Sequence, residues 1–250
     1  MNYIVLDLEF NQYFDFKDEN YKDEPMCPFE IMQIGAVKLN ENFETIDKMS
    51  FFIKPQIFTR MHPFVKKMTG IGMADLKHEP NFSEAYIKFI NFIGPEKCVL
   101  CVWGSVDVKL LYKNILYHKL NGKLLTKKYI DVQQIASIYF KQPNNNSIGL
   151  KAAVEKLDLE KKDDFHDALN DAVYTSEVFK AVREPDMPIR SFNLRHLRQA
   201  TFAQVNSVNS GLLFSFCERE LGRALTDTDK EFILKVYSSG QNKAFDLKKE

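Results

Sequence analysis

Residues 1–10 constrain this chain more than any other stretch, because they form an apolar run that ends in two carboxylates one residue apart. Side chains alternate between the two faces of a strand, so Asp7 and Glu9 leave the same face as Tyr3 and Val5. A rise of about 3.3 Å per residue separates the Cα atoms of the two acids by roughly 6.6 Å, so both can reach one cluster of cations. Apolar residues on both faces indicate a strand covered on both sides, where an unpaired carboxylate is costly. The run therefore predicts a positive partner for the two acids, unless the strand ends before them and leaves them in a solvated loop.

The composition fits one substantial globular domain with room for a small appendage. The 250 residues are 45% hydrophobic and 13% aromatic, which is enough to bury a large core. Lys and Arg together number 34, as do Asp and Glu, so no global field attracts nucleic acid or an anionic membrane. This balance argues against high-affinity coating of duplex nucleic acid. Any polyanionic ligand must be held by a local patch or by metal ions.

The sequence gives no sign of export or of a membrane span. The N-terminus lacks a basic segment followed by a small-residue cleavage site, and no apolar run is long enough to cross a bilayer. We therefore expect a soluble, cytoplasmic protein.

The four cysteines, Cys27, Cys98, Cys101 and Cys217, are too few and too scattered for a disulfide framework in a chain of this size. Cys98 and Cys101 have the spacing of zinc and redox sites. They lie in a stretch that is typical of a strand, however, where an offset of three sends the two thiols to opposite faces. We expect buried structural cysteines.

Hydrophobic periodicity and turn signals predict an α/β protein with a mixed five-stranded sheet flanked by helices. Strands come first, as a meander, and then alternate with helices, an order that indicates a mixed sheet with helices on its faces. The strands are expected at residues 1–10, 30–39, 45–54, 97–103 and 127–131, and the helices at 63–68, 82–93, 106–120, 147–157 and 165–182. Ser147 is the expected N-cap of the fourth of these helices.

Two segments depart from this regular pattern. Residues 11–29 form a polar stretch directly after the paired acids, and either shape or cover the site there or form a disordered surface insert. Further along the chain, Pro185 and Pro188 mark the end of the regular pattern of strands and helices. We therefore expect one domain at residues 1–183 and a mostly helical C-terminal extension, of unknown role, at 184–250.

Two further acidic features follow later in the chain. Asp107 comes just after the fourth strand, and an acid in a first helical turn is already explained by the helix dipole. The last long helix opens with a cluster in which Asp163 or Asp164 suits the N-cap. Five positions separate His166 from Asp171, about 140° around a regular helix, so they converge only if His166 lies on the loop that enters it. Each feature, taken alone, is weak evidence for a functional site.

Together, the three features occur in the order, and on the elements, that hold the three motifs of the DEDDh exonucleases within the ribonuclease H-like superfamily. The chain resembles this family in Asp7-x-Glu9, in Asp107 after Trp103-Gly104, and in the highly specific pattern His166-Asp-Ala-x-x-Asp171. The runs Asp-Leu-Glu-Phe, Glu-Ile-Met-Gln-Ile-Gly and Met-Thr-Gly-Ile further resemble the Eri-1-like/KapD branch of this family. The resemblance covers roughly residues 1–183 and implies a ribonuclease H-like fold for a DEDDh exonuclease domain.

The resemblance also implies a 3′-to-5′ exonuclease that hydrolyses phosphodiester bonds, mainly of RNA, and releases nucleoside 5′-monophosphates. The acids Asp7, Glu9, Asp107 and Asp171 would hold two divalent cations, with Asp7 bridging both. Such a pair can stabilise the charge that builds on the phosphoryl group and on the attacking and leaving oxygens. Ligation by oxygen alone favours Mg²⁺ or Mn²⁺ over zinc. His166 would be the general base, because imidazole titrates near neutrality.

Substrate contacts are implied at Phe10, Met68 and Thr69, although packing in the core is the alternative for the first two. Single-stranded or short RNA is the expected substrate, and single-stranded DNA is the rival. A nucleic-acid-binding scaffold without turnover is the alternative from another class, but binding alone does not require four acids and a histidine. No protein partner and no membrane are indicated, and we favour a monomer.

Overall fold

The computed structural model describes residues 1–15, 17–18, 21–24, 26–143, 146–160, 164–194, 225–226 and 229–230 of the chain. Residues 1–198 form one compact unit and residues 199–250 form another. After residue 194 the structure describes only residues 225–226 and 229–230, so most of the expected helical extension, including Cys217, lies outside the described residues. Within the described ranges, no helix is both long enough and apolar enough to span a membrane.

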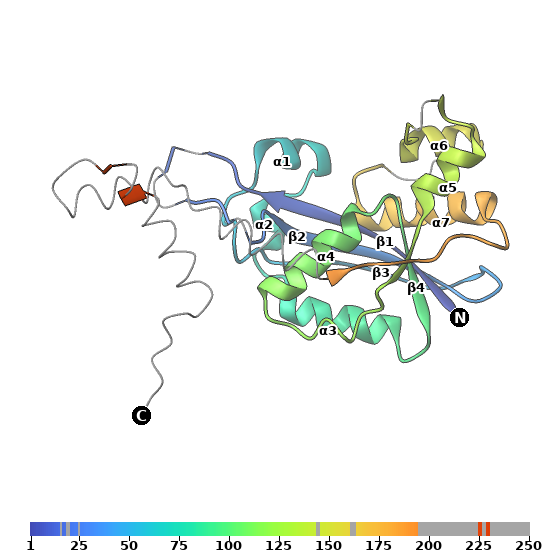
Figure 1. Ribbon diagram of the computed structural model, residues 1–250, viewed down its shortest axis with the longest axis horizontal. Coiled ribbons are helices and arrows are strands. Elements are labelled where there is room, and N and C mark those ends of the chain that lie inside the picture. Colours follow the sequence, from blue (N-terminus) through green and yellow to red (C-terminus); the bar gives the residue numbers. More distant parts are fainter. Residues whose placement is uncertain are drawn as a thin grey trace. The chain divides into compact units, whose positions relative to one another are not determined.

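A six-stranded mixed sheet forms the centre of the first unit, in the order β3-β2-β1-β4-β5-β6 (Figure 1). Its strands are β1 (Asn2–Gln12), β2 (Phe29–Leu39), β3 (Thr45–Phe52), β4 (Cys98–Val102), β5 (Lys128–Asp131) and β6 (Arg190–Ser191). β1 pairs antiparallel with β2 and parallel with β4, so the sheet changes direction at this strand. The predicted mixed sheet is confirmed. The structure adds β6, which has two residues and is too short to leave a pattern in the sequence.

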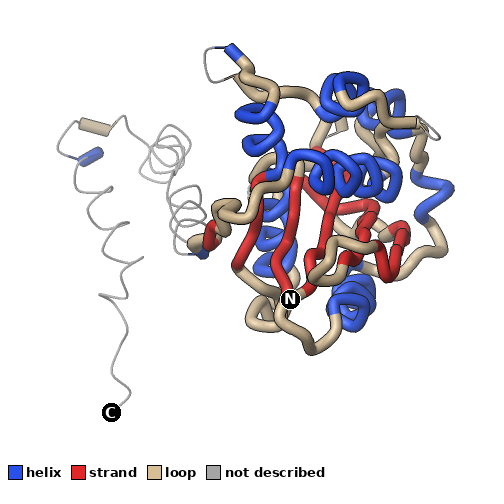
Figure 2. Tube along the Cα trace, turned by 90° about the vertical axis from the view of Figure 1, so that its right-hand side faces the viewer, coloured by secondary structure: helices blue, strands red, loops and turns tan. Residues whose placement is uncertain are grey.

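Helices cover both faces of the sheet (Figures 1 and 2). They are α1 (Pro63–Thr69), α2 (Met73–Leu76), α3 (Phe82–Ile93), α4 (Val106–Tyr117), α5 (Val132–Tyr139), α6 (Leu150–Lys156) and α7 (Ala168–Val182). One core cluster joins Leu6 on β1 to α3 and α4, and the other joins Val5 to α5, α6 and α7. The alternation of faces predicted for the first strand is thereby confirmed, and the face that carries Val5 also carries Asp7 and Glu9.

The helices differ from the expectation in several places. α2 was not expected, α4 ends at Tyr117 and not at residue 120, and α7 begins at Ala168 and not at residue 165. α6 begins after Gly149, which is its N-cap, so the expected N-cap at Ser147 is wrong. The sequence pattern did not indicate α5, because no loop separates it from β5. Asp131 ends β5 and also caps α5, where its side chain accepts a hydrogen bond of 3.0 Å from the backbone N–H of Gln134.

The polar segment at residues 11–29 is partly regular, because β1 continues to Gln12. In its described part, Tyr13 stacks on Tyr21 with ring centroids 5.4 Å apart. Asp18 forms an ion pair of 2.7 Å with Arg60, on the segment that leads to α1. These residues therefore pack against the chain that precedes α1.

The cysteines of the described chain are free thiols, of which Cys27 and Cys101 are buried, as expected, whereas Cys98 is half-buried. Cys98 packs beside the cluster under α3 and α4, whereas Cys101 is buried in the cluster under α5, α6 and α7. Their thiols therefore lie on opposite faces of the sheet and cannot share one metal ion.

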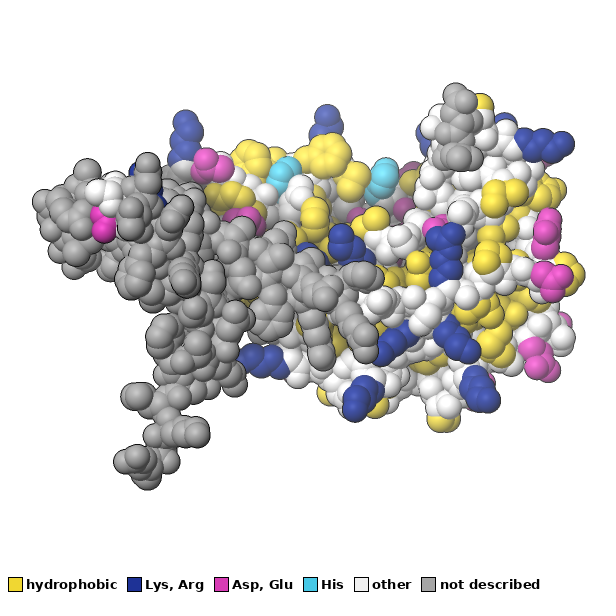
Figure 3. Space-filling model, viewed as in Figure 1, with side chains coloured by type: hydrophobic (Ala, Val, Ile, Leu, Met, Phe, Trp, Pro, Cys, Tyr) yellow, Lys and Arg dark blue, Asp and Glu magenta, His cyan; other side chains and the backbone are white. Residues whose placement is uncertain are grey.

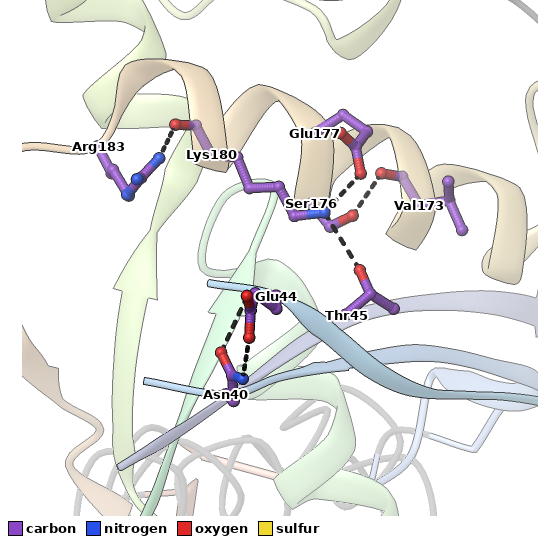
Figure 4. Close-up of polar contacts among 8 residues, drawn as sticks. All are labelled: Asn40, Glu44, Thr45, Val173, Ser176, Glu177, Lys180 and Arg183. Carbon is purple, nitrogen blue, oxygen red and sulfur yellow. Dashed lines mark hydrogen bonds and ion pairs between the residues drawn. The ribbon is translucent and has the colours of Figure 1, made fainter. Parts of the chain in front are cut away.

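The C-terminal half of α7 is fixed to the start of β3 (Figure 4). The ammonium group of Lys180 donates to the hydroxyl of Thr45 at 3.1 Å and to the carboxylate of Glu177 at 2.7 Å. One turn further on, the guanidinium of Arg183 lies 4.4 Å from the centre of the Phe43 ring, a cation–π contact. This end of α7 is therefore anchored by contacts far from the acids of β1.

The N-terminal end of α7 meets the sheet at Gly35 of β2. A Cβ atom at this position would lie 2.1–2.2 Å from the backbone of Ala168 and Leu169, closer than atoms can approach. Glycine is needed here because the backbones of helix and strand are in direct contact. Gly35 pairs with Asp7 across the sheet, so this approach brings the start of α7 directly over the first acid.

Candidate active site

The first two acids come from the middle of the sheet. Asp7 and Glu9 lie on β1, opposite Gly35 and Gln33 of β2. Glu9 is buried, with 7% of its surface exposed. The acids are thus part of a strand that is covered on both faces, and the alternative of a solvated loop is wrong.

Asp107 follows β4, the parallel neighbour of β1, and lies in the first turn of α4. Gly104, with a φ of 88°, reverses the chain between the two elements. The buried side chain of Asn114 fixes α4 to β2, since its amide donates to the carbonyl of Phe29 at 2.9 Å and its oxygen accepts from the N–H of Ile31 at 3.2 Å. Asp107 itself is buried and is thereby held beside the carboxyl end of β4.

His166 and Asp171 converge because α7 begins at Ala168, two residues after the histidine. His166 has a φ of 71°, in the left-handed region that non-glycine residues rarely adopt. Its backbone N–H donates to Oδ2 of Asp171 at 3.3 Å. The condition set by the sequence, a histidine on the entering loop, is therefore met. Single ligand atoms of Glu9, His166 and Asp171 all lie within 4.8 Å of one another.

The N-cap of α7 is Asp167, and the expectation of a cap at Asp163 or Asp164 is wrong. The carboxylate of Asp167 accepts the backbone N–H groups of Leu169 at 3.0 Å and Asn170 at 3.1 Å. Capping by the residue next to the histidine leaves His166 just outside the helix. The cap at Asp167 thus explains why the imidazole and Asp171 can face the same point.

The carboxylates of the site repel one another strongly. Burial, and next the charge of Asp107, raise the pKa of Asp7 well above its usual range. Burial and the charge of Asp171 raise the pKa of Glu9 to about 8. Burial also raises the pKa of Asp107 to about 7, although its own backbone N–H opposes the shift. These mutual effects show that the acids from β1, α4 and α7 face one another.

The pKa of Asp171 is raised as well, but contacts with His166 oppose the shift. Burial raises its pKa to about 6, while the hydrogen bond from His166 and the charge of that imidazole pull in the other direction. Its Oδ1 atom is buried and has no hydrogen-bond partner in the described part of the chain. A buried carboxylate oxygen without a partner is costly, so this atom is suited to accept a cation.

The donor set fits divalent cations of the Mg²⁺ class. Asp7, Glu9, Asp107 and Asp171 offer only oxygen atoms, the ligand type that Mg²⁺ and Mn²⁺ prefer. Four carboxylates also match the charge of two such ions.

The three residues expected to contact substrate lie outside this cluster of acids. Phe10 packs against the core under α3 and α4, with the Phe29 ring 6.4 Å away. Met68, on α1, has 37% of its surface exposed. The hydroxyl of Thr69 donates to the carbonyl of Val65 at 3.0 Å, within the last turn of α1. Their role in substrate binding stays a prediction.

Sequence analysis gave no role in the site to Gln33 or to Asp167. The structure joins them, because the amide of Gln33 donates to Oδ2 of Asp167 at 2.7 Å. The one signal in the sequence was that Gln33 is a polar residue in an otherwise apolar strand. Its partner lies 134 positions away in the chain.

Comparison with known proteins agrees with this geometry. The family model described as exonuclease, RNase T, matches residues 4–179. The DNA polymerase III subunit epsilon of Aquifex aeolicus is 27% identical over 160 residues, which are 62% of this chain and 72% of that protein. The nuclease domain of 3′hExo, a DEDDh family member bound to rAMP, has a TM-score of 0.63 at 22% identity, covering 77% of this chain and 97% of that one. Escherichia coli exonuclease I with a dA16 oligonucleotide has a TM-score of 0.56 at 15% identity, covering 73% of this chain and 41% of that one. The chain belongs to the RNase T family of exonucleases.

Proposed function

We propose that this protein is a metal-dependent 3′-to-5′ exonuclease that hydrolyses single-stranded or short RNA and releases nucleoside 5′-monophosphates. The observation that carries the proposal is that ligand atoms of Glu9, His166 and Asp171, from distant parts of the chain, lie within 4.8 Å of one another. Asp7 and Asp107 lie close enough that the charges of Asp107, Asp171 and Glu9 act on Asp7. Folding concentrates negative charge there, and the unpartnered Oδ1 atom of Asp171 faces inward. Without cations the carboxylates must keep protons to limit their repulsion, and bound cations would neutralise them instead.

We infer that Asp7, Glu9, Asp107 and Asp171 hold two divalent cations. When bound, such ions neutralise the charge that develops on the phosphoryl oxygens and on the attacking and leaving oxygens. Asp7, on the central strand, lies close enough to Asp107 and Asp171 for their charges to act on it, so it would, together with both, contribute to holding the ions. The same carboxylates repel the phosphates of a substrate until cations are present.

His166 is the proposed general base. Its side chain is exposed while Glu9 and Asp171 lie beside it, so it can reach a water molecule that approaches from solvent. The hydrogen bond between its backbone and Asp171 ties the position of the imidazole to that of a cation ligand. A positioned base contributes about 10²–10⁴-fold to the rate of such a reaction.

The exposed side chains near α1 support a single-stranded substrate. Along the edge where Figure 1 places α1, exposed hydrophobic and histidine side chains gather (Figure 3), and bases stack on such side chains. On α1, Met68 is 37% exposed, which supports the proposed contact with the terminal nucleotide, to which Phe10 and Thr69 would also contribute.

Ribonucleotides are the favoured substrate because the related nuclease domain of 3′hExo is bound to rAMP. That likeness also favours the Eri-1-like branch that the sequence motifs indicate. The rival is single-stranded DNA, since exonuclease I of similar fold is bound to a deoxyribonucleotide oligomer.

The proposal is tested with RNA and DNA oligomers of one sequence, labelled at the 5′ end and incubated with Mg²⁺ or Mn²⁺. A ladder that shortens from the 3′ end, with release of 5′-monophosphates, supports an exonuclease, and a faster ladder on RNA supports the proposed substrate. Asp7→Asn, which keeps the size of the side chain and removes its charge, is the matched control and should abolish release. Tight binding without release, equal in wild type and Asp7→Asn, would instead identify a scaffold.

A further inference from the structure

Gln33 lies at the point where the sheet, the acids and the last helix meet. On β2 it pairs with Glu9 of β1, so its side chain leaves the face that carries the acids. Only 1% of its surface is exposed. Two positions further along the strand, Gly35 lets the backbone at Ala168 approach directly. Gln33 is thus buried between the sheet and the start of α7.

Both ends of the Gln33 amide are used by the chain that enters α7. The nitrogen donates to Oδ2 of Asp167 at 2.7 Å, and more weakly to the hydroxyl of Ser50 at 3.3 Å. The oxygen accepts the backbone N–H of Ala168 at 3.2 Å. Because donor and acceptor are each matched, the amide has one orientation, and it fixes two successive residues of the entering chain.

Those two residues decide where the catalytic side chains lie. Asp167 caps the helix with its other carboxylate oxygen, and it directly follows His166, which has an unusual left-handed backbone. Asp171 follows one turn into the helix and accepts the N–H of His166. Movement of residues 167 and 168 therefore moves the imidazole and a cation ligand together.

We propose that Gln33 is a positioning residue of the active site, which holds His166 and Asp171 in place through a buried hydrogen-bonded pair with Asp167. The inference rests on the proposed function for its kinetic consequence. Gln33 touches neither substrate nor cation in this role. It sets the position of the proton acceptor and of one ligand relative to the acids on β1, where a displacement of about 1 Å can cost a hundredfold in rate.

The charge-swapped pair offers a sharp test. Gln33→Glu places two carboxylates face to face, and Asp167→Asn places two amide donors face to face. The double variant restores the pair, because the amide introduced at position 167 can donate to the carboxylate introduced at position 33. That carboxylate still accepts the N–H of Ala168, and the amide oxygen at position 167 still caps the helix at Leu169 and Asn170. The total charge of the pair is unchanged.

Kinetic constants are measured on the full chain with an RNA oligomer and saturating Mn²⁺. Each single variant should lower kcat at least tenfold with KM changed less than threefold, and the double variant should recover kcat to within about threefold of wild type. Lys180→Ala is the matched control, since it removes the hydrogen bond that joins the other end of α7 to Thr45 of β3. It should lower the melting temperature without lowering kcat.

Two results would overturn the proposal. The first is a kcat within twofold of wild type in both single variants. The second is a Lys180→Ala variant that loses as much kcat as Gln33→Glu, which would show that any loosening of α7 has the same effect.

Hydrogen exchange separates this inference from the proposed function. If wild type releases no mononucleotide, the proposed function fails, and the backbone N–H groups of residues 168–171 still report on the pair. Faster exchange in Gln33→Ala than in Lys180→Ala supports the positioning role. Equal exchange in the two variants overturns it.

Discussion

Replacement of Glu9 by glutamine should stabilise the cation-free protein near pH 8 and change its stability little near pH 4.5. Burial and the charge of Asp171 raise the pKa of Glu9 from 4.5 to about 8. Between these values the folded state keeps a proton that the unfolded chain has released. The free energy of unfolding therefore falls as the pH rises from about 4.5 to about 8. Glutamine carries no charge at either pH and avoids this loss.

The size of the effect follows from the shift in pKa. One pKa unit corresponds to about 1.4 kcal/mol, so the charged Glu9 side chain costs on the order of 4 kcal/mol at pH 8. For a chain of this length that corresponds to about 10 °C in melting temperature. Circular dichroism melts of wild type and Glu9→Gln, in EDTA at several pH values between about 4.5 and 8, measure it directly.

A surface acid provides the control. Glu41 is 78% exposed and forms an ion pair of 3.6 Å with the N-terminus, a contact that contributes little in water. Glu41→Gln should follow the wild-type curve across the whole pH range. A Glu9→Gln variant that is equally stable or less stable than wild type near pH 8 would refute the argument that crowded, buried charge destabilises the cation-free fold.

Three further changes test the proposed base, the contact between β2 and α7, and the attachment of residues 56–58 to β2. His166→Ala should lower turnover at neutral pH by about 10²–10⁴-fold while Mn²⁺ affinity from calorimetry stays largely intact; unchanged turnover would remove the histidine as base. Gly35→Ala should destabilise the protein by about 3 kcal/mol and abolish activity, because its Cβ collides with the backbone of Ala168; urea unfolding at wild-type stability would contradict this. Glu30→Gln should cost about 1–3 kcal/mol in urea unfolding, because the Glu30 carboxylate accepts three backbone N–H groups from residues 56–58; an unchanged midpoint would contradict it.

The sequence predicted the parts of the fold that local pattern controls. The strand that carries Asp7 and Glu9 has apolar residues on both faces, and the structure buries it on both. The convergence of His166 with Asp171 was a conditional prediction, which depended on where the helix begins. Helix geometry requires His166 to lie outside the helix, and the cap at Asp167 places it there.

The remaining features depend on contacts that sequence patterns do not encode. β6 has two residues and exists because it pairs with β5, more than 50 positions earlier in the chain. The role of Gln33 depends on a partner that the chain reaches only after folding. Short elements and buried polar pairs are set by tertiary packing, so a single sequence carries little signal for them.

The same crowding of acids determines how the acidic limb of a pH–rate profile should be read. Glu9, with a pKa of about 8, and Asp107, with a pKa of about 7, hold protons at neutral pH that cations must displace. Cation binding then releases protons and weakens as the pH falls. A limb caused by these carboxylates should therefore move to lower pH when the Mn²⁺ concentration is raised, whereas a limb caused by His166 acting as base should stay in place. Profiles of kcat/KM at two Mn²⁺ concentrations distinguish the two. A limb that does not move at all would show that protonation of the carboxylates does not limit the reaction, and would assign the limb to the imidazole.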